Sequence, residues 1–166
     1  NGDVAGHGNA GCIEHPNRAD PNYQTFGNGL VAYGNPLEPT ALGSGGAQGA
    51  GGGAIKLVCA GDLKLDGTIT ASATTRGSGG SIWIVCGGEF SGAGAVRADA
   101  PTVGDRSSSG GRIAIYHGSS TFTGAVSAAG GWTGFLWSNG GVGTLYEPGR
   151  YPLGTAENPP LLFYYT

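Results

Sequence analysis

A short phrase that begins with two glycines occurs four times in this chain and limits the folds available to it. Alternating apolar residues follow the glycines, and the copies continue at Ala54, Ser81, Arg112 and, more weakly, Val142. These starting points place successive copies 27, 31 and 30 residues apart. A period of roughly 20 to 50 residues is typical of solenoids, in which each repeat is one coil that buries its apolar side against its neighbours.

A second alternating segment keeps nearly the same spacing. Residues 67–71 are matched by residues 94–98 and 124–128, which follow after 27 and 30 residues. Because side chains alternate across a strand, one side of each segment is expected to face inward. The sequence therefore predicts an all-β chain with two strands in each repeat, joined by arcs rich in Gly and Ser.

The predicted architecture is a parallel solenoid of about four coils. Residues 1–53 are an irregular segment rich in Gly and Asn that includes the first coil, residues 54–147 are the repeats, and residues 148–166 are an extended C-terminal docking strand. An antiparallel β-sandwich is the alternative, because its short strands also recur, about every 8 to 12 residues. A sandwich does not require equivalent residues to return after a whole coil, which favours the solenoid.

Composition excludes several classes of function. The net charge is −3, and the eight Lys and Arg residues are scattered, so no basic stripe could bind nucleic acid. No apolar run approaches the roughly 18 residues that span a membrane. Charged residues make up only 11% of the chain, Gly contributes 36 residues, and Met is absent even at position 1. These features suit a trimmed, secreted protein in an extracellular or cell-surface location.

The repeats resemble a known family of sequences. The phrases GGGAIKLVCAGDLKLDGTITASATTRGSGGSIWIVCGG and GGRIAIYHGSSTFTGAVSAAGG are similar to Gly-rich repeats of large secreted bacterial surface proteins. The resemblance covers about residues 30–147. It implies a right-handed parallel β-helix in an extracellular setting, and it carries over no catalytic residue.

Cysteine spacing raises the question of a disulfide. Cys59 and Cys86 are 27 residues apart, one coil, so they are expected to lie about 4.8 Å apart on neighbouring strands. They could form a bridge that joins two coils, or remain free thiols in the core. Cys12 could instead pair with either of them, or with another chain.

Candidates for metal binding and catalysis are weak. His7, Cys12, Glu14 and His15 offer ligand types that zinc prefers, but their spacing matches no familiar site, so a polar loop is the prediction. The acidic residues of the arcs lack the strict Gly-Gly-x-Gly-x-Asp repeat of calcium-binding solenoids, although a surface calcium ion stays open. No paired carboxylates, nucleophile elbow or phosphate loop is present. We expect no enzyme activity and no cofactor.

Aromatic residues mark the expected contact surface. One cluster lies in the third arc, and a second ends the chain after two prolines; the tail could dock on its own coils or on a neighbouring subunit. The predicted assembly contacts are Trp132, Phe135, Trp137, Leu161, Leu162, Phe163, Tyr164 and Tyr165.

The function expected from these features is structural. Solenoids that lack polar caps expose unpaired strands, and contacts that do not close produce filaments. We therefore predict a homopolymer, the subunit of an extracellular filament, sheath or surface layer, assembled by end-to-end stacking and terminal strand docking. The alternative is an adhesin-like or carbohydrate-binding surface module, in which Trp132, Trp137 and Tyr116 would stack on the sugars of a surface polysaccharide.

Overall fold

The chain is all-β over the residues that the computed structural model describes, which are 33–46, 49–102, 107–132 and 140–150. Ten strands and no helix are found in these ranges. The strands are β1 Ala54–Cys59, β2 Leu63–Lys64, β3 Thr68–Thr70, β4 Ser81–Cys86, β5 Glu89–Ser91, β6 Ala95–Arg97, β7 Arg112–Tyr116, β8 Ser119–Ser120, β9 Ala125–Ser127 and β10 Thr144–Tyr146.

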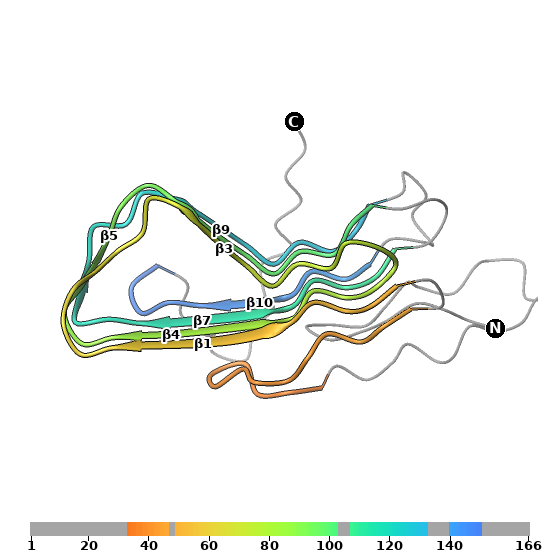
Figure 1. Cartoon of the computed structure of the whole chain (residues 1–166), viewed down its shortest axis with the longest axis horizontal. Coiled ribbons are helices and arrows are strands. Elements are labelled where there is room, and N and C mark those ends of the chain that lie inside the picture. The colour runs from red at the N-terminus through yellow and green to blue at the C-terminus, as the bar shows by residue number, and fades with distance from the viewer. Residues whose placement is uncertain (1–32, 47–48, 103–106, 133–139, 151–166) are drawn as a thin grey trace, which may run out of the picture.

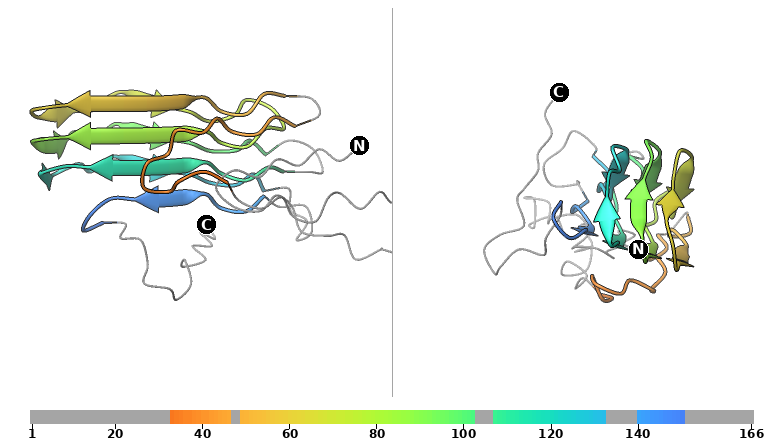
Figure 2. Two further views of the ribbon diagram at one scale, coloured as in Figure 1. Left: turned by 90° about the horizontal axis from the view of Figure 1, so that it is seen from below. Right: turned by 90° about the vertical axis from the view of Figure 1, so that its left-hand side faces the viewer.

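The strands form three parallel sheets that the chain visits in a fixed order. The first sheet has the order β1-β4-β7-β10, the second β2-β5-β8 and the third β3-β6-β9. Each repeat contributes one strand to each sheet before the chain returns to the first sheet. Successive repeats overlie one another in Figure 1 and lie side by side in Figure 2. All strand pairs named between these elements are parallel, so the alternative of an antiparallel sandwich is wrong for this part of the chain.

The sequence predicted two of the three strands in each repeat. The segments expected at the start of the repeats are β1, β4 and β7, and those expected after residues 67, 94 and 124 are β3, β6 and β9. The strands of the second sheet were missed. They are only two or three residues long, and β8 consists of two serines, so no alternating pattern marks them.

The register confirms the 27-residue repeat and corrects the alignment of the fourth copy. Ile55 lies opposite Ile82, which lies opposite Ile113. In the fourth copy, however, Thr144 lies opposite Arg112, whereas the sequence pattern had placed Val142 there. A shift of two residues keeps the same side chains on the inner face, so alternation alone could not detect it.

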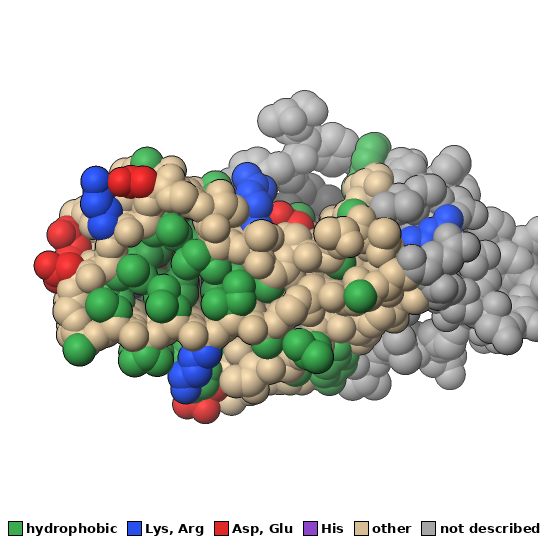
Figure 3. Space-filling model, in the orientation of Figure 1, with side chains coloured by type: hydrophobic (Ala, Val, Ile, Leu, Met, Phe, Trp, Pro, Cys, Tyr) green, Lys and Arg blue, Asp and Glu red, His purple; other side chains and the backbone are tan. Residues whose placement is uncertain are grey.

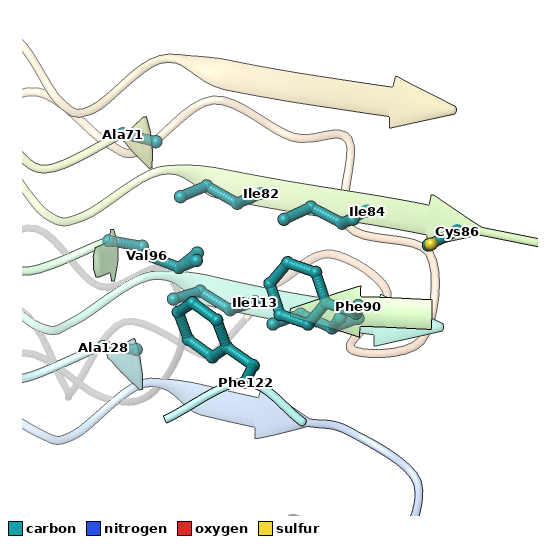
Figure 4. Close-up of a cluster of buried hydrophobic side chains, with 11 residues drawn as sticks. Ala71, Ile82, Ile84, Cys86, Phe90, Val96, Ile113, Phe122 and Ala128 are labelled. Carbon is teal, nitrogen blue, oxygen red and sulfur yellow. The ribbon is translucent and has the colours of Figure 1, made fainter. Parts of the chain in front are cut away.

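Apolar side chains fill the space between the three sheets (Figure 4). In the first sheet, Ile82, Ile84 and Ile113 are completely buried, and they face Phe90 of the second sheet and Val96 of the third. Phe90 stacks on a ring from the next repeat, that of Phe122, with a distance of 4.5 Å between the ring centroids. The core is therefore a set of ladders in which similar side chains from successive repeats contact one another.

The glycine pairs lie where the third sheet and the first sheet approach each other. The N–H of Gly80 donates to the carbonyl of Ala71 at 2.8 Å, and Gly111 donates to Ala98 at 2.7 Å. A Cβ on Gly79 would overlap the Ala98 carbonyl oxygen. Glycine is required here because two backbones come into direct contact, and this explains the phrase that opens each repeat.

A strap, defined here as residues 33–42, crosses the outer face of the first sheet. Arg112 donates from Nε to the carbonyl of Tyr33 at 2.9 Å, and the Tyr116 hydroxyl donates to the carbonyl of Leu37 at 2.9 Å. Ser81 donates to the carbonyl of Ala41. Burial under the strap lowers the pKa of Arg112 and raises that of Tyr116. The strap covers this face of β4 and β7, so the face is not available for stacking against another sheet.

Candidate functional site

The three sheets share one edge at which no strand of the described ranges pairs further. Each sheet begins with a strand of the first repeat: β1, β2 and β3 are the outermost members of their sheets. Such strands leave a row of backbone N–H and C=O groups ready to pair with another chain. We call this edge, together with the core side chains beside it, the open end.

The open end exposes part of the apolar core. Figure 3 looks onto it and shows hydrophobic side chains gathered in the space between the strands, with charged groups at the rim. Leu57 and Ile69 are only partly buried, whereas their register partners, Ile84 and Val96, are completely buried. The partly buried side chains of the first repeat are Ile55, Leu57, Leu63, Leu65 and Ile69. One more layer of chain would complete their burial.

Charges of both signs lie at the rim of this end. Lys64 and Asp66 form an exposed ion pair with 2.9 Å between Nζ and Oδ2. The hydrogen bond between them raises the pKa of Lys64 and lowers that of Asp66. Lys56 lies with its Nζ 3.6 Å from the centroid of the Trp83 ring, a cation–π contact on the outer face. The rim therefore offers polar partners around an apolar centre.

The opposite edge of the sheets has a different character. Arg150 donates to the carbonyls of Phe122 and Gly124 at 3.4 and 3.1 Å. Its guanidinium lies 3.9 Å from the carboxylate of Glu147, which is 1% exposed and 3.4 Å from Nε2 of His117. We call the turn of residues 147–150 and the strands beneath it the closed end, because these side chains satisfy backbone groups of the third repeat.

Acidic side chains between the ends bridge neighbouring repeats. The carboxylate of Asp62 accepts the N–H of Glu89 at 2.8 Å, and that of Asp99 accepts the N–H of Ala129 at 2.8 Å. Within the described residues, no group of three or more His, Cys, Asp or Glu side chains could hold a metal ion. These carboxylates support the backbone where strand pairing is interrupted. The candidate zinc ligands His7, Cys12, Glu14 and His15 lie outside the described residues.

The cysteine prediction is confirmed in its placement. Cys59 and Cys86 are register partners on β1 and β4, and both are free thiols in the structure. The Cys86 thiol contacts the carbonyl of Gly61 at 3.2 Å. In-register side chains of parallel strands stay about as far apart as the strands, roughly 4.8 Å, whereas a disulfide needs Cβ atoms within about 4.5 Å. Cys12 lies outside the described residues.

Of the predicted assembly contacts, the structure describes only Trp132. Its side chain is 63% exposed at the tip of the third arc. Tyr116, the remaining described aromatic of the predicted sugar-binding set, is half-buried, and its ring lies 5.2 Å from that of Tyr146. The other contacts, Phe135, Trp137, Leu161, Leu162, Phe163, Tyr164 and Tyr165, lie outside the described residues.

Sequence reasoning missed both ends as sites. The open end could have been found by assigning Ile55, Leu57 and Leu63 to the outermost strands once the register was known. The closed end had no sequence signal, because Glu147 and Arg150 form no motif. No helix in the described ranges is long and apolar enough to cross a membrane. Comparisons of the chain with models of protein families, with curated proteins and with solved structures found no match.

Proposed function

We propose that this chain is a right-handed parallel β-helix that serves as the subunit of an extracellular filament, sheath or surface layer. The parallel pairing of equivalent strands in three sheets supports the β-helix, since each repeat then corresponds to one coil. The likeness of the repeats to Gly-rich surface proteins supports the same fold. Copies associate end to end, and the C-terminal segment contributes a docking strand.

One observation carries this proposal: the first strands of all three sheets end at the same apolar edge. Full burial of an aliphatic side chain contributes about 1.5–3 kcal/mol. Completing the burial of the five partly exposed side chains of the first repeat would therefore supply on the order of 5 kcal/mol. Pairing of the three edge strands would add backbone hydrogen bonds. A surface of this kind favours association with another molecule over exposure to water.

The extracellular setting is part of the proposal. A surface with 11% charged residues and many glycines suits close packing of copies better than dispersal in the crowded cytosol. The strap supports growth along one direction, because it covers the outer face of the first sheet and leaves the open end uncovered.

The decisive experiment places a charge at the open end. Replacing Leu57 by lysine is expected to abolish assembly at micromolar concentration, because association would bury an unpaired ammonium group. Sedimentation velocity and electron microscopy measure assembly, and circular dichroism checks that the variant still folds. Leu42→Lys is the matched control, since Leu42 is 65% exposed and lies away from this edge. A wild-type chain that stays monomeric, or assembly unchanged by Leu57→Lys, would contradict the proposal.

A second candidate function, binding of a surface polysaccharide, is favoured by the exposure of Trp132. An exposed indole can stack on the apolar face of a sugar ring. If the candidate is right, Trp132→Ala should abolish retention on a polysaccharide array, while Leu42→Ala should leave it unchanged. Absence of any retention of the wild-type chain would eliminate this function.

A further inference from the structure

We infer that the molecule seated on the open end is a second copy presenting its own open end, so that two copies meet about a two-fold axis. This inference rests on the proposed function and specifies its first contact. Two modes of end-to-end stacking exist: open end on closed end, which repeats without limit, and open end on open end, which produces a closed pair. The two ends of this chain differ enough to discriminate between them.

Stacking the open end on the closed end is unfavourable. It would place Leu57 and Ile69 against the turn that holds Glu147 and Arg150. Arg150 would have to leave the carbonyls of Phe122 and Gly124, to which it donates, before those carbonyls could pair with β-strands of another copy. The Glu147 carboxylate, already 1% exposed, would then face an apolar layer without its guanidinium neighbour. Charges moved into apolar surroundings without a partner are strongly destabilising.

Stacking two open ends brings apolar side chains onto apolar side chains. In Figure 1 the corner between the second and third sheets lies across from β1. A two-fold axis that passes through the middle of β1 and through this corner sets β1 antiparallel to its own copy. It also sets β2 against the copy of β3. Antiparallel strands pair at least as stably as parallel ones, so all three edges find partners.

The rim charges are complementary under this same axis. Lys64 and Asp66 are two residues apart and lie at the corner between β2 and β3, near the axis. Rotation therefore places Lys64 of one copy opposite Asp66 of the other, and the converse pair forms on the other side. Four charges of alternating sign would close the rim. Like charges would not meet across the seam, which supports this mode of contact.

The test uses single cysteines on β1 and on the closed end. Lys56 lies in the middle of β1, and Pro148 is exposed on the turn of the closed end. Lys56→Cys and Pro148→Cys are made in full-length chain that carries Cys12→Ser and Cys59→Ser, and each is treated with a short bis-maleimide. A residue near a two-fold axis meets its own copy, so Lys56→Cys alone should form covalent dimers. Pro148→Cys alone should form none, and mixing the two variants should add no mixed dimer.

The outcomes separate the inference from the proposed function. Adding Leu57→Lys to Lys56→Cys should eliminate the covalent dimer, whereas adding Leu42→Lys should leave its yield unchanged. A mixed dimer that forms only when both cysteine variants are present would overturn the two-fold contact but leave end-to-end assembly intact. Monomers in every sample would overturn both, and would show that another part of the chain occupies the open end.

Discussion

Gly79→Ala is expected to lower the free energy of unfolding by roughly 3 kcal/mol or more, which would leave much of the chain unfolded. The added Cβ would overlap the Ala98 carbonyl oxygen and the backbone nitrogen of Gly111. Both obstacles are backbone atoms of the neighbouring segment, so no rotamer change can remove the clash. Separating the two backbones would also weaken the bond from Gly111 N–H to Ala98, which is 2.7 Å long.

Gly67→Ala is the matched control for this substitution. A Cβ on Gly67 would meet nothing within 4 Å, and no left-handed backbone angle is required there. Such a change is expected to be neutral or to stabilise by about 0.4–1 kcal/mol, through reduced freedom of the unfolded chain. Urea denaturation followed by circular dichroism measures both variants. Equal stability of the two would show that the contact between the third and first sheets is looser than described.

The sequence contained most of the fold because the repeat fixes position in three dimensions. Equal spacing of Ile55, Ile82 and Ile113 predicted one ladder, and the structure pairs these residues directly. The glycine phrase, used at first only to align the repeats, also marks the closest approach of two sheets. The period alone could not reveal the strands of the second sheet, because Leu63 and Phe90 are single inward residues flanked by polar neighbours.

The candidate site was less accessible from the sequence. An alternating pattern shows which side chains face inward, but not which repeat lies at the end of a stack. Ile55 and Ile82 are identical in the pattern, yet only Ile82 is completely buried. The closed end depends on Arg150 reaching back to Phe122 and Gly124, contacts of 28 and 26 residues in sequence separation that no local rule predicts. Sequence reasoning emphasised the aromatic residues, of which the structure describes Trp132.

Ile82→Ala is expected to lower the free energy of unfolding by about 3–4 kcal/mol, because the side chain is completely buried and its removal leaves a cavity between two neighbouring repeats. Ile55→Ala removes the same atoms from the same ladder but from a partly exposed position, so about 1–2 kcal/mol is expected in the dilute, monomeric chain. Denaturant titration at nanomolar concentration measures both values.

Protein concentration gives this pair of variants its second use. If a copy covers the open end, the side chain of Ile55 becomes buried on association, and Ile55→Ala should weaken assembly as well as folding. Ile82 is buried in the single chain already, so Ile82→Ala should reduce the folded fraction without changing the affinity between folded copies. Sedimentation equilibrium of both variants under conditions where they are folded distinguishes the two effects. If Ile55→Ala leaves the association constant unchanged, the apolar centre of the open end is not part of any contact between copies.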